Sequence, residues 1–297
     1  MKIGNTYKIA GINLDIHSDN KYLHNRLKVF EDNNPNRIDL FAETRRCHYI
    51  EKPEGQLVID EFVKWMKKDD DGGFHVYRMD TAGRDIMAHV DINRDWSRNI
   101  IKCLNIRFNK SGDPAETGDW MEYYSFMLMG IVFRNRLINM DGIVIHASSI
   151  AWRDRGLLFT APSGTGKSTH VCLWEKYLGA EVTVVNDDTP AVRFFDGVPT
   201  LCGTPWSGSS DKFANLQVPV RAIVVLKQAP VNSISELSPL EALPCLMPRA
   251  FLPYFDRELM EKAYSVLEMI LKQVPVYLLE CTPEKKAMEL VYECVRH

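Results

Sequence analysis

The sequence predicts an α/β C-terminal domain, residues 116–297, that follows a β-rich (α+β) N-terminal domain, residues 1–115. Three observations lead to this prediction. Short apolar or alternating stretches separated by turn signals fill the first part of the chain, which is typical of strands. From Asp119 the apolar spacing becomes helical, and helices then alternate with strands. Within this second part, an apolar strand leads through a glycine-rich loop directly into a helix.

The N-terminal domain is expected to contain short strands joined by turns. Turn signals such as Asp71-Gly72-Gly73 interrupt the apolar stretches. The polar segment 109–118 marks the predicted boundary between the domains. Such a domain could bind a substrate or a partner. The strands are expected at 7–16, 56–59, 74–79 and 86–90.

The C-terminal domain is expected to begin with a long apolar helix that runs from Trp120 to near Asn139. The aromatic residues of this helix could line a cofactor pocket, but a core helix that docks the two domains is the better interpretation. Further helices are expected at 167–178, 257–272 and 283–295, and strands at 142–147, 156–160, 181–185, 221–226 and 276–280.

Composition favours a globular protein of the cytoplasm. A formal charge of −3 gives no electrostatic reason to expect nucleic acid as a partner. No apolar run is long enough to cross a membrane, and the start of the chain lacks the apolar stretch of a signal peptide. The seven cysteines are scattered singly, which favours reduced thiols and a cytoplasmic location.

The glycine-rich loop has the residues of a phosphate-binding loop (P-loop, Walker A). Glycines allow backbone N–H groups to turn toward phosphates, and the following helix N-terminus adds partial positive charge. Lys167 is expected to reach the β- and γ-phosphates of ATP, and the Ser168 hydroxyl is expected to bind Mg²⁺. Ala161 stands where the consensus has its first glycine. The predicted nucleotide-binding residues are Ser163, Gly164, Thr165, Gly166, Lys167, Ser168 and Thr169.

An acidic pair, Asp187 and Asp188, directly follows the expected strand 181–185. Carboxylates at the C-terminal end of such a strand lie at the edge of the sheet where the phosphate loop opens. One carboxylate could hold Mg²⁺ and the other could accept the proton of an attacking hydroxyl. A helix cap or turn is the alternative, since Asp-Asp-Thr-Pro is also favourable turn chemistry.

The block from Ile145 to Arg193 resembles the HPr kinase/phosphorylase family and, more distantly, the nucleotide domain of phosphoenolpyruvate carboxykinases. The matching residues are Ile145-His146-Ala147-Ser148, the strand and loop 156–169, and 185–189. The resemblance implies a P-loop kinase domain in which His146 lies near the metal or the transferred phosphate. It also implies that Asp187 and Asp188 are the metal and base carboxylates, without saying which is which, and that the protein could form a homo-oligomer.

This chain departs from the bifunctional HPr enzymes downstream of the acidic pair. Their glycine-rich signature and HPr-contacting loop are not found, so HPr as substrate and phosphorolysis are not expected. The chain instead carries a hydroxyl-rich loop, residues 203–212, which could form a lid with Trp206 against a base or substrate and Lys212 facing phosphate. A plain surface loop is the alternative. Arg249 is a further candidate for stabilising γ-phosphate charge.

These features predict an ATP-dependent kinase that transfers phosphate to a hydroxyl, with Mg²⁺ as cofactor. The resemblance to HPr-kinase-related proteins implies that the acceptor is serine in a peptide or protein, or free serine. Asp187, Asp188, His146 and Lys167 are the predicted catalytic residues, and Ser168 and Asp187 the predicted metal ligands. The alternative is a nucleotide-responsive binding module without phosphotransfer. A bare ATPase is a weaker possibility, because no water-orienting residue can be identified.

Overall fold

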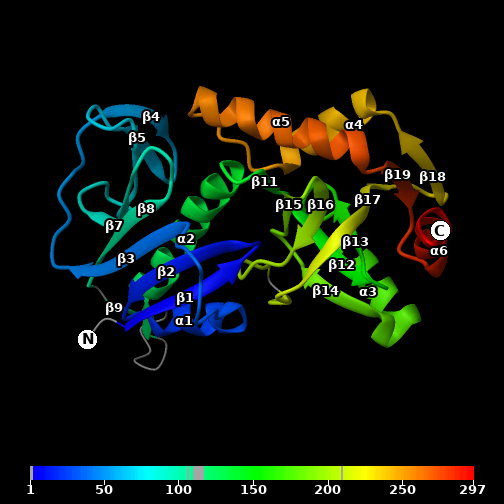
Figure 1. Cartoon of the computed structure of the whole chain (residues 1–297), viewed down its shortest axis with the longest axis horizontal. Coiled ribbons are helices and arrows are strands. Elements are labelled where there is room, and N and C mark those ends of the chain that lie inside the picture. Colours follow the sequence, from blue (N-terminus) through cyan, green and yellow to red (C-terminus); the bar gives the residue numbers. More distant parts are fainter. Residues whose placement is uncertain (1–2, 106, 110–116, 209) are drawn as a thin grey trace. The chain divides into compact units, whose positions relative to one another are not determined.

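The computed structural model of the protein describes all residues except 1–2, 106, 110–116 and 209 (Figure 1). The chain divides into two compact units, Met1–Arg136 and Leu137–His297. The domain boundary predicted between 115 and 116 lies outside the described residues. The chain has a mixed α/β structure with large sheets, which confirms the prediction at this coarse level. Within the described part, no helix is both long and apolar enough to cross a lipid bilayer.

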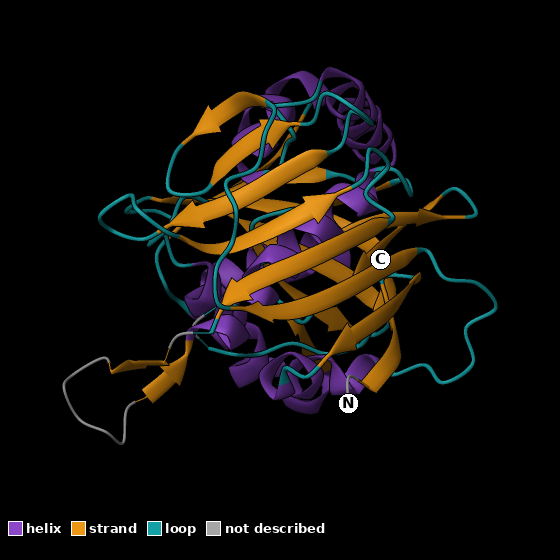
Figure 2. Cartoon of the chain, turned by 90° about the vertical axis from the view of Figure 1, so that its left-hand side faces the viewer, coloured by secondary structure: helices purple, strands orange, loops and turns teal. Residues whose placement is uncertain are grey.

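The first unit is built on an eight-stranded sheet with the order β1-β2-β3-β8-β7-β6-β5-β4, whose strands lie side by side in Figure 2. Only the pairs β2–β3 and β3–β8 are parallel. The strands are β1 (Ile3–Ile9), β2 (Ile12–Ser18), β3 (Leu40–Cys47), β4 (Gln56–Asp60), β5 (Lys64–Lys67), β6 (Phe74–Met79), β7 (Ile86–Ile92) and β8 (Arg98–Leu104), and β9 (Arg107–Asn109) pairs with β10 (Thr117–Asp119) apart from them.

The strand expected at 7–16 is two strands, β1 and β2. They are joined by a tight turn in which Ala10 and Gly11 have φ values of 48° and 73°. Alanine rarely adopts this left-handed conformation, so the sequence carries only a weak turn signal there. The strands β3, β5 and β8 were also not anticipated, and β6 and β7 begin where they were expected.

The described residues of the first unit include α1 (Lys21–Leu27) and, as far as Arg136, α2 (Trp120–Ile138), and a 3₁₀ turn, η1 (Lys28–Phe30), follows α1. Asn20 caps α1 and also donates its side-chain amide to Ser125 and to the Glu122 carbonyl of α2. Arg136 donates to the carbonyl of Asp39, the residue just before β3. These contacts fasten α2 to the sheet as a core helix of the first unit, and its expected role in docking the two domains stays a prediction.

The second unit holds a nine-stranded sheet with the order β11-β15-β16-β17-β13-β12-β14, to which β19 and β18 are added beside β17. Its strands are β11 (Gly142–Val144), β12 (Ala147–Trp152), β13 (Arg155–Thr160), β14 (Val182–Asn186), β15 (Ala191–Phe195), β16 (Val198–Cys202), β17 (Gln217–Gln228), β18 (Ser233–Leu237) and β19 (Val276–Cys281). The helices are α3 (Lys167–Leu178), α4 (Pro239–Leu246), α5 (Arg257–Gln273) and α6 (Lys285–Val295), with 3₁₀ turns η3 (Gly179–Glu181) and η4 (Met247–Arg249).

Helices cover both faces of this sheet, as Figure 1 shows with α5 above the strands and α3 below them. On the α3 side, Trp152 of β12 and Trp174 of α3 meet edge to face with ring centroids 5.8 Å apart. Tyr292 of α6 packs on the same Trp152 ring. Burial of these large apolar surfaces fixes α3 against β12 and β13, which determines where its N-terminus lies.

Candidate functional site

Strand directions bring three separate segments to one edge of the second unit's sheet. The strand β12 is antiparallel to both β13 and β14, so β13 and β14 run in the same direction. The loop after β13 and the acidic pair after β14 therefore leave the sheet at the same edge, and His146, which precedes β12, lies there too. The parallel strands β17 and β19 also end at this edge.

The loop between β13 and α3, residues 161–166, takes a path that depends on its two glycines. Gly164 and Gly166 have φ values of 76° and 111°, which other residues rarely adopt. Among the described residues, no side chain caps the N-terminus of α3. The first backbone N–H groups of an α-helix lack intrahelical acceptors, and together with the helix dipole they form an anion-binding site.

Lys167, the first residue of α3, is buried beneath this loop, and its ammonium donates to the Ala161 carbonyl at 3.3 Å. Burial lowers the pKa of Lys167, Asp188 opposes that shift, and Arg249 adds to it. The same two residues influence His146, so Lys167, Asp188, Arg249 and His146 share one electrostatic environment.

Asn186, the last residue of β14, holds the backbone of the acidic pair in place. It is fully buried, and its side-chain oxygen accepts from the N–H groups of Asp188 and Thr189. Its side-chain amide donates to the carbonyls of Thr204 and Trp206. A buried amide that is bonded on both sides fixes the turn and joins it to the loop 203–212.

The two carboxylates of the pair have different partners. The Asp188 carboxylate lies 3.1 Å from Nε2 of His146. Burial lowers the pKa of His146, Lys167 and Arg249 act in the same direction, and Asp188 opposes them. His146 is therefore neutral near pH 7, and a neutral imidazole that faces a carboxylate can accept a proton.

The Asp187 carboxylate is instead held by the loop 203–212. Its oxygens accept hydrogen bonds from the backbone N–H of Gly208, at 2.7 Å, and from the Ser210 hydroxyl. A Cβ at position 208 would lie 3.2 Å from Cβ of Asp188, so glycine allows this close approach. Lys212 was expected to face the phosphate. Its ammonium instead pairs with Glu175 of α3 at 2.8 Å.

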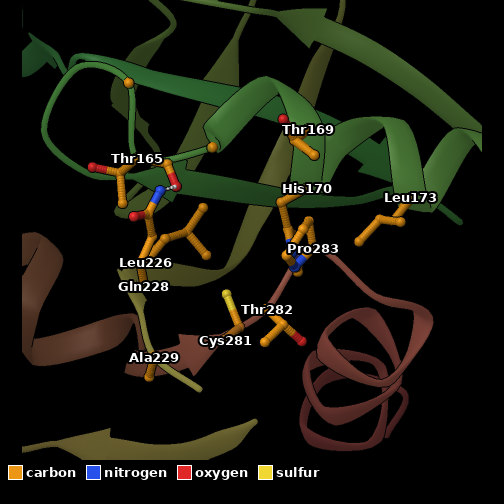
Figure 3. A pocket seen from close by; sticks show the side chains of 12 residues that line it. Thr165, Thr169, His170, Leu173, Leu226, Gln228, Ala229, Cys281, Thr282 and Pro283 are labelled. Atoms are coloured by element: carbon orange, nitrogen blue, oxygen red, sulfur yellow. Dashed lines mark hydrogen bonds between the residues drawn. The ribbon is translucent and has the colours of Figure 1, made fainter. Parts of the chain in front are cut away.

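One pocket of about 370 Å³ gathers the predicted site residues. Thr165 is the exception, because it lines an adjoining cavity of about 640 Å³ that is drawn in Figure 3. Gly208 also lines the smaller pocket. The other lining residues are His146, Ser163, Gly164, Gly166, Lys167, Ser168, Thr169, Asp187 and Asp188.

Sequence reasoning missed the supporting residues of the site. Asn186 was part of the motif but had no assigned role, and Ser210 was only one of several hydroxyl residues in a loop. Gly208 acts through its backbone, which leaves no signal other than the glycine itself. Each is recognisable only once the loop 203–212 is known to return to the end of β14, where Ala214 donates to the Val185 carbonyl.

The oxygen groups of the pocket fit a magnesium ion that is shared with a phosphate ligand. Mg²⁺ is usually held by one or two carboxylates and by phosphate oxygens. The pocket offers the Ser168 hydroxyl and the carboxylates of Asp187 and Asp188. Within the described part of the chain, no group of three or more His, Cys, Asp or Glu side chains is arranged to hold a metal by itself.

Comparison with known proteins gives a family match and distant similarities to solved structures. The family model described as SynChlorMet cassette protein ScmC matches residues 115–291. Among solved structures, the chain is similar to the HPr(Ser) kinase/phosphatase from Coxiella burnetii, with 13% identity and a TM-score of 0.31. That similarity covers 52% of this chain and 88% of that chain. A search of curated proteins finds no match.

Proposed function

The chain belongs to the ScmC family of SynChlorMet cassette proteins, and from the geometry of its pocket we propose that it is an ATP-dependent kinase. The proposed reaction transfers the γ-phosphate to a hydroxyl group, with serine in a peptide or protein, or free serine, as the expected acceptor. The observation that supports this function most strongly is the shared pocket of Lys167, Ser168, the acidic pair and His146 at an uncapped helix N-terminus.

In this proposal the loop 161–166 and Lys167 bind the β- and γ-phosphates. The first N–H groups of α3 and the Lys167 ammonium supply positive charge where negative charge must be held. Ser168 and Asp187 would hold Mg²⁺, which supplies further neutralisation of the phosphate charge. Arg249 adds a cation near His146 and Lys167, in keeping with its effect on the pKa of both groups.

The pair of Asp188 and His146 is proposed to accept the proton of the acceptor hydroxyl. The contact of 3.1 Å allows the proton to rest on either the carboxylate or the neutral imidazole. This assignment leaves Asp187, whose carboxylate is held by Gly208 and Ser210, as the metal ligand. Catalysis would then be mostly positioning and charge neutralisation, as is usual for phosphoryl transfer.

The test is a transfer assay with ATP labelled at the γ-phosphate, Mg²⁺, and a panel of serine peptides, threonine peptides and free serine. We expect label on a hydroxyl acceptor with the wild-type chain and at least about 100-fold slower transfer with Lys167→Ala. Lys176→Ala, a change on the exposed part of the same helix, is the matched control and should transfer label normally. Failure of the wild-type chain to bind ATP would overturn the proposal.

A regulatory module that binds nucleotide without phosphotransfer is the second candidate. One observation favours it, namely that the loop 203–212 already occupies the Asp187 carboxylate through Gly208 and Ser210. A nucleotide that displaces Gly208 and Ser210 from the Asp187 carboxylate would change the conformation of this loop. Binding of ATP without loss of its γ-phosphate to any acceptor in the panel would favour this function over the kinase.

A further inference from the structure

The cavity beside the phosphate-loop pocket lies between the first half of α3 and the ends of β17 and β19 (Figure 3). It encloses about 640 Å³. Gly164, Gly166 and Thr169 line both this cavity and the smaller pocket. A ligand whose phosphates lie on the loop 161–166 can therefore extend into the larger cavity without crossing the protein.

The walls of the cavity are mainly apolar, with few polar groups. Leu173, Leu226, Ala229 and Pro283 supply apolar surface, which suits a flat heterocyclic ring. The Thr282 hydroxyl is already hydrogen-bonded to Asn232. The side chains of His170 and Gln228 each make one hydrogen bond to the protein and keep a second polar atom that can bond a ligand.

His170 is a largely buried residue that lines this cavity and carries a hydrogen-bond donor. Only 3% of the residue is exposed, and its Nε2 accepts from the Trp174 indole N–H at 3.3 Å. Burial lowers the pKa of His170 to about 4, so the ring is neutral at pH 7. Since Nε2 acts as the acceptor, the proton lies on Nδ1, for which no hydrogen-bond partner exists among the described residues. A ligand in the cavity can supply an acceptor for this donor.

Gln228, at the end of β17, presents the complementary group. Its side-chain amide nitrogen donates to the Thr165 carbonyl at 3.3 Å, the contact drawn as a dashed line in Figure 3. The amide oxygen of Gln228 is therefore free to accept. A donor and an acceptor on one cavity can pair with adenine, whose edge carries a ring nitrogen acceptor beside an amino donor, whereas guanine held in the same orientation presents the reversed pair.

We propose that this cavity binds the adenine nucleoside of the nucleotide, with the Nδ1–H group of His170 and the amide oxygen of Gln228 selecting the base. The inference rests on the proposed function, because it requires phosphates on the loop 161–166. It adds a base-recognition site on α3 and β17 that lies outside the phosphate-loop motif.

Calorimetric titration of the full chain with ATP, GTP and inorganic tripolyphosphate, each with Mg²⁺, tests this site. ATP should bind at least about tenfold more tightly than GTP or tripolyphosphate, the ratio that 1.4 kcal/mol of base recognition produces. Ala229→Trp fills the cavity at a half-buried position, and it should bring the ATP affinity down to that of tripolyphosphate without changing tripolyphosphate binding. Ala180→Trp, at an exposed position in η3, is the matched control and should change nothing.

A second pair of variants tests the histidine. His170→Leu removes the donor and should abolish the preference for ATP over GTP, while His170→Asn retains a donor at the branch that carries Nδ1 and should keep much of it. Unchanged ATP affinity in Ala229→Trp, together with lost binding in Lys167→Ala, would overturn this inference and leave the phosphate site standing. If the wild-type chain bound neither ATP nor tripolyphosphate, the proposed function and this inference would both fail.

Discussion

Two histidine clusters, one in each unit, contain similar residues in different surroundings. In the first unit, His75 of β6 and His89 of β7 approach to 3.0 Å, and Lys68 donates to Asp91 beside them. In the second unit, His146 and Asp188 are 3.1 Å apart and line a pocket. Burial lowers the pKa of His89 to about 3, and it also lowers the pKa of His146. A perturbed histidine is therefore not by itself a sign of function.

The difference between the clusters comes from their positions along the strands. His75, His89 and Asp91 lie within paired strands, where the register places Tyr77 opposite His89 and His75 opposite Asp91. His146 and Asp188 lie where the chain enters or leaves the sheet. Strand ends leave side chains facing a pocket instead of a neighbouring strand, and the uncapped α3 adds anion-binding groups there.

The largest loss of phosphotransfer is expected from Lys167→Ala, because Lys167 lines the same pocket as His146 and Asp188. Loss of its ammonium should lower phosphotransfer by about 10²–10³-fold, the usual scale for a preorganised group that stabilises developing charge. His89→Gln should leave the transfer rate unchanged. Steady-state rates of both variants with ATP and a serine acceptor check this, and a similar loss in both would mean that the clusters do not differ in function.

The acidic pair should give the next largest effect. Asp187→Asn and Asp188→Asn should each lower the rate at least about 100-fold, as for other acid–base and metal-binding groups. Asp196→Asn, in the exposed turn between β15 and β16, is the matched control. Rate–pH profiles sharpen the assignment, since Asp188→Asn should alter the profile more than Asp187→Asn does. Wild-type rates in both variants would remove the pair from the mechanism.

The cluster of the first unit should instead affect stability. Because the pKa of His89 is lowered from 6.5 to about 3, the unfolded chain binds the proton more strongly between these values. The free energy of unfolding is therefore highest above about pH 6.5 and decreases as the pH falls toward 3. Between pH 7 and pH 5 the loss amounts to about 2 kcal/mol. Urea unfolding of the wild type and of His89→Gln should show a smaller pH dependence in the variant, and equal dependence would contradict this account.

The smallest effect is expected from Ser210→Ala. The Ser210 hydroxyl donates to the Asp187 carboxylate, so its removal should free that carboxylate for Mg²⁺. One hydrogen bond of about 1 kcal/mol corresponds to a fall of about fivefold in the Mg²⁺ concentration needed for half-maximal rate. Ser265→Ala on α5 is the control. An unchanged Mg²⁺ requirement would show that the loop 203–212 does not compete for Asp187.

Motifs and strong periodicity made part of this structure predictable. The helix at 167–178 has the expected bounds, because it directly follows the glycine-rich loop motif, and the strand ending at Asn186 places the acidic pair where it was expected, because that strand is rich in valine. By contrast, β12 was not predicted beyond Ala147, since its sequence Ala-Ser-Ser-Ile-Ala-Trp mixes small, polar and apolar residues without a clear period. The central strand that orients β13 and β14 was therefore missing from the prediction.

The support of the site could not be read from sequence for a similar reason. Asn186, Gly208 and Ser210 act through contacts between segments about 20 residues apart, and these contacts depend on how the loop 203–212 folds back. The cavity beside His170 needs the ends of β17 and β19, which only the sheet order brings to α3. Local patterns contain no information about such pairings.

The most direct test of the central claim is a titration of ATP in the presence and absence of Mg²⁺, with the wild type and with Asp187→Asn. If Lys167, Ser168 and the acidic pair form one magnesium–nucleotide site, Mg²⁺ should strengthen ATP binding to the wild type, and most of that gain should be lost in the variant. Equal gains in both proteins would contradict the account, as would a wild-type chain that does not bind ATP.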